Sequence, residues 1–198
     1  MMTRPKPTMQ EKDFILASSS PQRKALLQSI NYHPKAFCPA NIDETALKDE
    51  KPLPYIKRIA KQKALAVSKL HPNENILSAD TIIVVGQKII QKSKTREEQT
   101  KVMELLSGRT HRVITSVCLI DKTSRISQKT ITTKIVMKHL TKDEIETYVS
   151  SNEWVGVAGY KIEGLLAGFV KKIIGSYSGV VGLPLYETKN LLTGAGIK

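Results

Sequence analysis

Segments with the pattern of β-strands alternate along this chain with segments that have the pattern of α-helices. No internal repeat or low-complexity linker interrupts this alternation. It is typical of α/β proteins, in which helices cover the faces of a sheet. We therefore predict a mixed, twisted β-sheet flanked by helices, with two lobes and a central cleft. The predicted strands cover residues 14–18, 76–85, 112–120 and 131–139, and helices are predicted to begin near residues 21, 54, 95, 141 and 184.

Short capping signals mark where several of these helices begin. Ser20 followed by Pro21 is typical of a serine N-cap with proline at the first helical position. Thr95 and Thr141 each precede a glutamate by three residues, which is the spacing of a capping box. These signals predict helix starts at the junctions between strands and helices.

The later part of the chain and the domain limits give two further predictions. Residues 160–181 contain apolar segments separated by glycines, and we predict strands there. The connections between elements are short, as expected within a single domain. We predict a flexible extension at residues 1–12 and one domain over residues 13–198.

The charge of the chain restricts its partners. Lys and Arg number 31 against 18 Asp and Glu, a net charge of +13 that favours polyanions, either phosphorylated small molecules or nucleic acid. The basic residues are dispersed rather than gathered in a tail. Aromatic residues make up only 5% of the chain and no base-stacking motif is present, which argues against a nucleic-acid module.

The sequence also favours a cytoplasmic, reduced protein. No apolar run approaches the roughly 20 residues needed to span a membrane. The only apolar stretch near the N-terminus covers residues 14–17, so no signal peptide is expected. Cys38 and Cys118 are far apart and lack ligand-like spacing, and the four histidines form no metal motif. We expect neither a disulfide framework nor a zinc site.

The turn after the first predicted strand is a candidate anion site. Ser18 and Ser20 are followed by Arg23 in the first turn of a helix. Free N–H groups at a helix N-terminus, together with hydroxyls and a guanidinium, bind phosphate well. An ordinary capped helix with a surface arginine explains the same residues equally well.

Asp80 interrupts the apolar run of residues 76–85. A carboxylate buried without a partner is costly, so Asp80 predicts a cation, a metal ion or a turn at this point. A functional role is favoured over a strand-end aspartate, because breaches of a local pattern concentrate at functional sites.

Other charged residues allow two interpretations each. Asp43 and Glu44 can help to bind a divalent ion, although solvated loop acids are the ordinary alternative. Lys63 lies four residues after Ile59 on the apolar side of a predicted helix, where it either meets an anion or extends to solvent. Lys88, Lys92 and Lys94 follow the strand of Asp80 and either bind phosphate or face water.

Six stretches of this chain resemble motifs of the Maf family of nucleoside triphosphate pyrophosphatases, in the same broad superfamily as the inosine triphosphatases. No single motif suffices, but six in the family's order form a specific signal. Together they extend over nearly the whole chain from residue 14 to about residue 192. The stretches are residues 15–23, 42–45, 58–64, 79–81, 106–111 and 175–185.

The resemblance implies metal-assisted hydrolysis of a nucleoside triphosphate to the monophosphate and pyrophosphate. The family's catalytic aspartate, which accepts a proton from the attacking water, falls on Asp80. Its acidic metal-associated position falls on Glu44, so Glu44 and Asp80 would hold Mg²⁺ or Mn²⁺. The phosphate-binding arginine falls on Arg23. The remaining matches are the serine of the first loop, at Ser18 or Ser20, and two lysines, at Lys63 and Lys92.

Three positions resemble the family's base-specificity set, and they point in different directions. The pyrimidine-preferring branch carries arginine, threonine and glutamine there, and the 7-methylguanosine triphosphate branch carries tryptophan, glutamine and glutamate. This chain carries Gln22, Thr81 and Glu163. An ionised glutamate only accepts hydrogen bonds, so Glu163 favours a base edge with two donors, as guanine has.

The chain also departs from the family near residues 157–160, where a lysine is lost and the loop is about one residue shorter. Lys161 replaces the lost cation if the local chain turns it inward. Two alternatives to an efficient enzyme therefore remain. One is a nucleic-acid-binding or division-linked regulatory protein of the same fold, and the other is a family member that has lost efficient catalysis. Apolar residues near the C-terminus are compatible with a homodimer.

Overall fold

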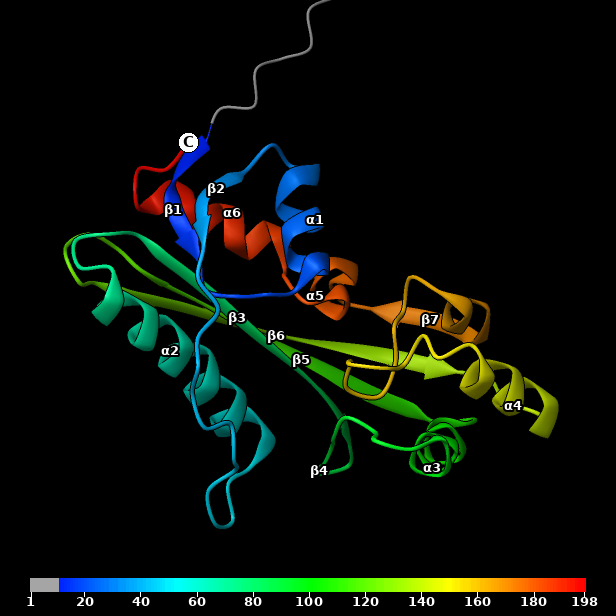
Figure 1. Ribbon diagram of the computed structural model, residues 1–198. Coiled ribbons are helices and arrows are strands. Elements are labelled where there is room, and N and C mark those ends of the chain that lie inside the picture. Colours follow the sequence, from blue (N-terminus) through cyan, green and yellow to red (C-terminus); the bar gives the residue numbers. More distant parts are fainter. Residues whose placement is uncertain (1–10) are drawn as a thin grey trace, which may run out of the picture.

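The computed structural model describes residues 11–198 (Figure 1). Residues 1–10 of the predicted extension lie outside the described residues, and the remaining two, Glu11 and Lys12, open the first strand. The strands are β1 (Glu11–Leu16), β2 (His33–Phe37), β3 (Ile76–Val85), β4 (Lys88–Ile90), β5 (Thr110–Ile120), β6 (Ile126–Met137) and β7 (Val170–Ile174). The helices are α1 (Pro21–Ser29), α2 (Pro52–Leu70), α3 (Arg96–Leu106), α4 (Lys142–Ser150), α5 (Tyr177–Val181), α6 (Leu185–Gly194) and the 3₁₀ helix η1 (Leu165–Phe169).

The strands form one seven-stranded mixed sheet in the order β2-β1-β3-β5-β6-β7, with β4 paired to β3 outside that row. β1 pairs in parallel with β2 and β3, whereas the other pairs are antiparallel. The predicted mixed sheet flanked by helices is therefore confirmed.

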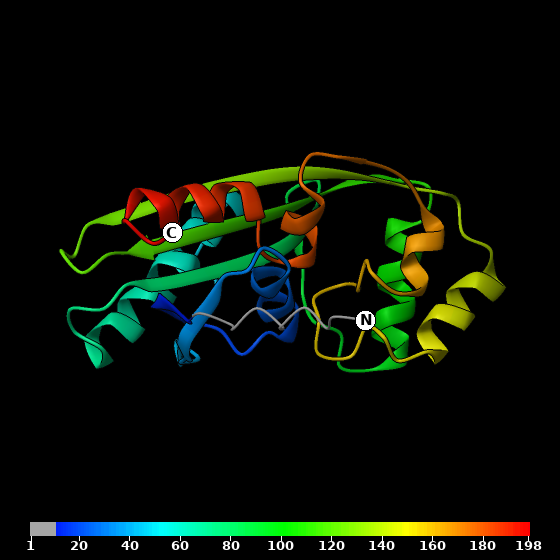
Figure 2. The ribbon, with the colours of Figure 1, turned by 90° about the horizontal axis from the view of Figure 1, so that it is seen from above.

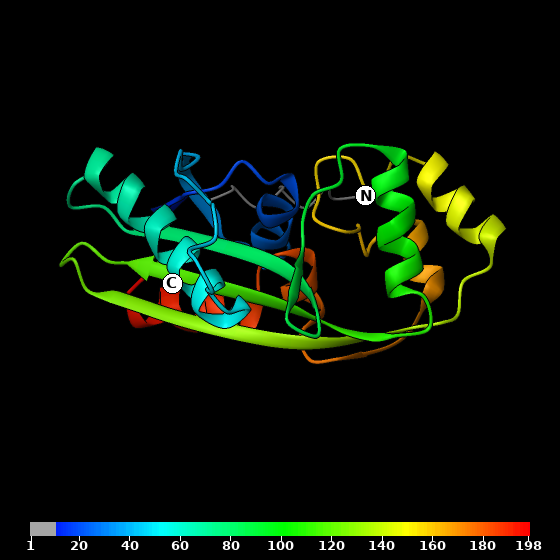
Figure 3. The same ribbon diagram turned by 90° about the horizontal axis from the view of Figure 1, so that it is seen from below.

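Helices cover both faces of the sheet around β3. Alternate residues of a strand point to opposite faces. Ile76 and Ile82 pack beneath α2, while Leu77 and Ala79 pack beneath α1 and α6. Viewed from above, α6 lies in front of the long strands, and viewed from below α2 does (Figures 2 and 3). Burial on both faces explains why the sequence of β3 is a nearly continuous run of apolar residues.

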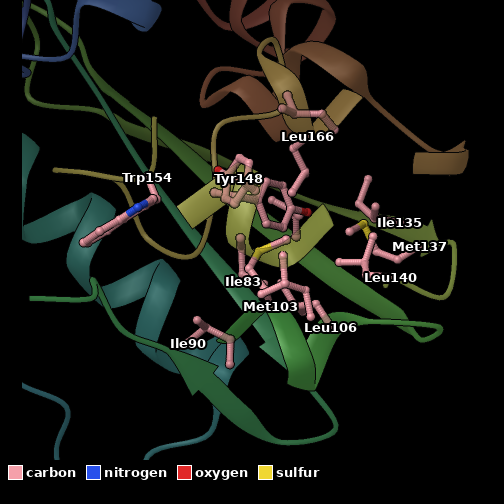
Figure 4. Packing of buried hydrophobic residues seen from close by; sticks show 14 of the residues in the cluster. Ile83, Ile90, Met103, Leu106, Ile135, Met137, Leu140, Tyr148, Trp154 and Leu166 are labelled. Carbon is pink, nitrogen blue, oxygen red and sulfur yellow. The ribbon is translucent and has the colours of Figure 1, made fainter. Parts of the chain in front are cut away.

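A second lobe lies at the other end of the long strands, around α3, α4 and η1 (Figures 2 and 3). Its core gathers Ile83, Met103, Tyr148, Trp154 and Leu166 into one buried cluster (Figure 4). The indole of Trp154 donates to the Val149 carbonyl, which satisfies its buried N–H. Because β3, β5 and β6 run through both lobes, a residue near the middle of β3 lies between them.

The pairing of β3 changes at its middle. β1 pairs with β3 at Ile76 and Leu77, and β4 pairs with the same edge only from Ile83 to Val85. In the described part of the chain, residues 78–82 therefore have a ladder partner, β5, on one side only. Asp80 lies in this interval, just beyond the carboxyl end of β1. In α/β sheets, ligands bind outside the carboxyl ends of strands, where the topology changes.

Several sequence predictions match the structure and others do not. The bounds of β3 match residues 76–85, Ser20 caps α1, and Thr141 and Glu144 form a complete capping box. Thr95 caps α3, but the Glu98 carboxylate accepts from the Lys94 N–H instead of completing the box. β2 and β4 were not predicted.

The prediction of strands throughout residues 160–181 was wrong. Only β7 is a strand there, flanked by η1 and α5. At Gly175, φ is +130°, a backbone conformation that side chains rarely adopt. The glycine therefore turns the chain from β7 into α5 instead of interrupting one strand. None of the helices described is long and apolar enough to cross a membrane.

Candidate active site

A cleft of about 1270 Å³ runs between the two lobes, with Asp80 in its wall. The cleft is lined by the turn after β1, the loop before α2, the middle of β3, the segment after β4, the loop after α4 and the end of α5. Every predicted site residue lines it; their functional roles remain predictions. These residues are Ser18, Ser20, Gln22, Arg23, Glu44, Lys63, Asp80, Thr81, Lys92 and Glu163.

Two carboxylates converge on one ammonium group in this cleft. Lys63 Nζ lies 2.7 Å from Asp80 Oδ1 and 2.9 Å from Glu44 Oε1. The Lys63 and Asp80 side chains are only 11% and 12% exposed, whereas that of Glu44 is 50% exposed. A buried carboxylate needs a cation, and Lys63 supplies it.

The packing of α2 on β3 produces this contact. Ser78 Oγ donates to the Ala60 carbonyl at 2.6 Å, which fixes the middle of α2 over β3. Asp80 is two residues further along the strand on the same face. Lys63 is three residues further along the helix, so it lies one turn from Ala60 on the same side. The apolar-side position of Lys63 therefore directs its ammonium to a buried anion rather than to solvent.

The turn after β1 brings Arg23 to Asp80 from the other side. Arg23 Nη1 donates to Ser18 Oγ at 3.0 Å and Nε donates to the Gly182 carbonyl at 2.9 Å. Arg23 Nη2 lies 4.0 Å from Asp80 Oδ1, and the side chain is 12% exposed. Burial lowers the pKa of Arg23, and Asp80 and Glu44 oppose this effect. The surface-arginine alternative is wrong, because Arg23 points into the cleft.

Ser20 and Gln22 complete the same turn. Ser20 Oγ accepts from the Arg23 N–H at 3.4 Å as the N-cap of α1. It also donates to Gln22 Oε1 at 3.1 Å, which leaves the Gln22 amide NH₂ as the donor available to a ligand. Ser20 thus caps α1 and also lines the cleft beside Gln22.

The loop that carries Glu44 is held by two side chains of α2. Tyr55 Oη donates to the Glu44 carbonyl at 2.8 Å, and Arg58 Nη2 donates to the Thr45 carbonyl at 3.0 Å. Arg58 also binds both oxygens of Glu50, at 2.8 and 2.6 Å. These hydrogen bonds lower the pKa of Glu50 to about 2. Sequence reasoning missed these positioning residues, although Arg58 belongs to one of the family-like motifs.

Buried hydrogen bonds join two segments of the opposite wall. Lys92 forms an isolated antiparallel bridge with Ala158. Gln99, which is 1% exposed, accepts from Ser93 Oγ at 2.8 Å and donates to the Gly159 carbonyl at 2.7 Å. A Cβ at Gly159 would lie 2.8 Å from the Cδ1 of Ile83, and φ there is +75°. Glycine is therefore needed where this loop crosses β3.

This wall leaves three lysines available to a ligand. Lys92, Lys94 and Lys161 line the cleft, and their ammonium groups form no ion pair within residues 11–198. The Lys161 N–H donates to Tyr148 Oη at 3.2 Å, which fixes its backbone. Lys88 lies in β4 and is not among the residues that line the cleft.

Thr81 lies on the face of β3 opposite Asp80. Its hydroxyl oxygen lies 2.9 Å from Thr115 Oγ1, and Thr115 donates to the Gly179 carbonyl at 2.7 Å. Thr115 is directly opposite Thr81 in the β3–β5 ladder and is 1% exposed. These contacts fix the Thr81 side chain against α5 at the cleft wall.

A buried histidine supports the loop beside Lys161. His111 Nε2 lies 2.5 Å from Tyr160 Oη, and the two rings meet edge to face. Burial lowers the pKa of His111 from 6.5 to about 4. Its contacts with Tyr160 are those of a buried structural residue.

This shift predicts a loss of stability in mild acid. In the unfolded chain His111 is protonated below about pH 6.5, whereas in the folded protein it is protonated only below about pH 4. The free energy of unfolding is therefore unaffected by this group above pH 6.5, and it decreases by about 3 kcal/mol as the pH falls to 4. Urea unfolding of the wild type and His111→Gln should show a stability difference that shrinks over this range. A pH-independent difference would contradict the prediction.

The fold and the cleft define a class of α/β proteins that bind phosphate-rich ligands between two lobes, beside paired carboxylates and several cations. The chain belongs to the Maf family: residues 13–195 match the family described as Maf-like protein. The family resemblance predicted from six motifs is therefore confirmed.

Relatives cover nearly the whole chain. The dTTP/UTP pyrophosphatase of Paramagnetospirillum magneticum is 46% identical over 184 residues, which is 92% of this chain and 97% of the relative. That of Caulobacter vibrioides is 43% identical over 186 residues, 93% of this chain and 96% of the relative. A solved nucleoside-triphosphatase (dITP/XTP pyrophosphatase) from Mycobacterium abscessus is 11% identical with a TM-score of 0.42, covering 64% of this chain and 75% of its own.

Proposed function

We propose that this protein hydrolyses nucleoside triphosphates to the monophosphate and pyrophosphate. The observation that carries the proposal is the convergence of Glu44, Lys63 and Asp80 in a cleft that also presents cations to a polyphosphate. Relatives of nearly equal length, which are more than 40% identical, bear the name of this activity.

In the proposed reaction, a water oxygen attacks the α-phosphorus and the bond to the bridging oxygen breaks, which releases pyrophosphate. Asp80 accepts the proton that the water loses. Arg23 and Lys92 bind phosphate oxygens and stabilise the negative charge that develops during transfer. Lys161 is placed in the same wall and supplies the cation that the shortened loop lacks.

We also propose that Glu44 and Asp80 hold Mg²⁺ or Mn²⁺ with the substrate. The two carboxylates fit this role, because they already converge on a cation at Lys63 Nζ. Among the described residues, no group of three or more His, Cys, Asp or Glu side chains could hold a metal ion. Two carboxylates completed by phosphate oxygens and water are the usual magnesium site of nucleotide enzymes. The ion would neutralise phosphate charge and acidify bound water.

Pyrophosphate release from a nucleotide panel tests the activity. The panel contains UTP, dTTP, CTP, GTP and methylated guanosine triphosphates, each with Mg²⁺, with Mn²⁺ and with chelator. The proposal requires metal-dependent release of equal amounts of monophosphate and pyrophosphate. Release of inorganic phosphate alone would exclude cleavage after the α-phosphate.

Gln22, Thr81 and Glu163 are the proposed base-reading residues. The relatives named above are dTTP/UTP pyrophosphatases. Uracil and thymine present one N–H between two carbonyl oxygens, whereas guanine presents an N–H beside an amino group. A carboxylate accepts hydrogen bonds only, so Glu163 moves the preference of this chain toward guanine.

Replacing Glu163 by glutamine should shift turnover toward uracil and thymine nucleotides. Glutamine can both donate to a base carbonyl and accept from the base N–H. The ratio of kcat/KM for UTP to that for GTP should rise by about 10- to 100-fold. Glu104→Gln, which removes the charge of an exposed residue on α3, should leave the ratio unchanged. An equal ratio in wild type and Glu163→Gln would exclude base reading by Glu163.

The cytoplasm is the proposed compartment, because nucleoside triphosphates are made and used there. A homodimer, with which the sequence is compatible, is likewise a proposal. Its support is the exposure of large side chains near the C-terminus, where Tyr177 is 50% and Tyr186 is 76% exposed.

A further inference from the structure

Lys63 occupies the point at which the two acidic side chains of the cleft converge. Its ammonium contacts Asp80 Oδ1 at 2.7 Å and Glu44 Oε1 at 2.9 Å. The lysine comes from α2, the aspartate from β3 and the glutamate from the loop before α2. Among residues 11–198, no other cation contacts Glu44, and Arg23 is 4.0 Å from Asp80.

An ammonium and a divalent ion compete for such a pair of oxygens. Both are attracted by the same negative charges, and they repel one another at close range. Arg23 and Lys63 already balance the charges of Glu44 and Asp80. A divalent ion that entered alone would leave two uncompensated positive charges in a largely buried place, which is costly.

We propose that the Lys63 ammonium occupies the position of the metal ion between Glu44 and Asp80. A divalent ion then enters this site only together with the phosphates of a nucleotide. The phosphate oxygens give the displaced ammonium a new partner and supply the negative charge that the ion requires. Lys63 thereby couples metal binding to nucleotide binding, and the coupling acts equally in both directions. This inference rests on the proposed function for the identity of the nucleotide.

Other groups hold Glu44 and Asp80 in position for the ion. Tyr55 and Arg58 hold the backbone at Glu44 and Thr45, and the strand pairing of β3 with β5 holds Asp80. The backbone of both acidic residues therefore stays in place when Lys63 turns away. Glu44, at 50% exposure, is the more accessible of the two, and Lys63 can move toward the open cleft beside it.

Binding of Mn²⁺ to the whole protein without nucleotide, measured by electron paramagnetic resonance, tests this proposal. The wild type should bind Mn²⁺ weakly, and Lys63→Met should bind one ion at least tenfold more tightly. Lys63→Gln, which keeps a hydrogen-bond donor to Asp80, should show the same change and replaces the first variant if that fails to fold. Lys61→Met removes an exposed lysine two residues earlier on α2 and should behave as the wild type.

Adding α,β-methylene-UTP, which resists cleavage of the α–β linkage, completes the test. It should strengthen Mn²⁺ binding to the wild type, after correction for the ion bound by free nucleotide, and strengthen it much less in the Lys63 variants. Asp80→Asn combined with Lys63→Met should remove the tight ion, which locates it at this pair. Equal Mn²⁺ affinity of nucleotide-free wild type and Lys63→Met would overturn the proposal, because the ion would then use the other carboxylate oxygens beside Lys63.

The outcome does not depend on turnover. If no nucleotide releases pyrophosphate, the proposed function fails, while the Mn²⁺ affinities of the nucleotide-free proteins still decide whether Lys63 excludes the ion. If pyrophosphate is released but the affinities are equal, the activity stands and the role of Lys63 is refuted.

Discussion

Replacing Asp80 by asparagine should lower kcat for pyrophosphate release by about 10²- to 10⁴-fold, the range expected for loss of a general base. Asparagine has the same shape and keeps an oxygen that can accept from Lys63, but it cannot take a proton from water. Single-turnover measurements should locate the loss in the chemical step, and equilibrium binding of α,β-methylene-UTP in the presence of chelator should be retained.

Asp49→Asn is the matched control for this change. Asp49 is exposed and is not among the residues that line the cleft, and asparagine readily adopts its φ of +57°. Its turnover should therefore stay close to the wild-type value. Turnover of Asp80→Asn within about tenfold of the wild type would assign the proton to another acceptor.

Replacing Arg23 by methionine should lower kcat/KM by about 10³-fold or more, in the range reported for arginines that stabilise phosphoryl transfer. Arg23 uses Nε on the Gly182 carbonyl and Nη1 on Ser18, and its Nη2 lies near Asp80. Its loss removes a phosphate ligand and also the contact between the turn after β1 and the end of α5. KM should therefore rise and kcat should fall.

Arg23→Lys should not restore the activity, because one ammonium cannot reproduce the three directions of the guanidinium. Lys24→Met provides the control, since Lys24 is the next residue on α1 and is exposed. Full activity of Arg23→Lys would show that only the charge at this position matters. The thermal unfolding temperature of each variant shows whether the lower activity comes from the lost phosphate contact or from loss of the folded structure.

Much of the fold could be predicted because its signals are local. The caps of α1, α3 and α4 depend on residues within one turn of each helix start, and β3 has the period and length of a buried strand. β2 escaped prediction because it is a five-residue edge strand that contains Pro34, and proline is tolerated in such a strand. β4 has three residues and exists only through its pairing with β3.

Residues 160–181 show where local patterns fail. Their buried apolar residues come from a loop, a 3₁₀ helix, a short strand and a short α-helix, and pack into one cluster with residues of α3 and α4. The glycines among them permit turns of several kinds, so their spacing did not distinguish interrupted strands from this arrangement. Long-range packing selected the observed one.

The sequence by itself determined the alternation of strands and helices, the caps and the identity of the charged residues that line the cleft. It also raised the question of why Asp80 interrupts an apolar strand. Only the tertiary structure decided that Lys63 contacts both Asp80 and Glu44, that Arg23 turns inward, and that Tyr55 and Arg58 hold the acidic loop. The reason is physical: caps and periodicity act within a few residues, whereas these contacts depend on how α2 and the turn after β1 pack against β3.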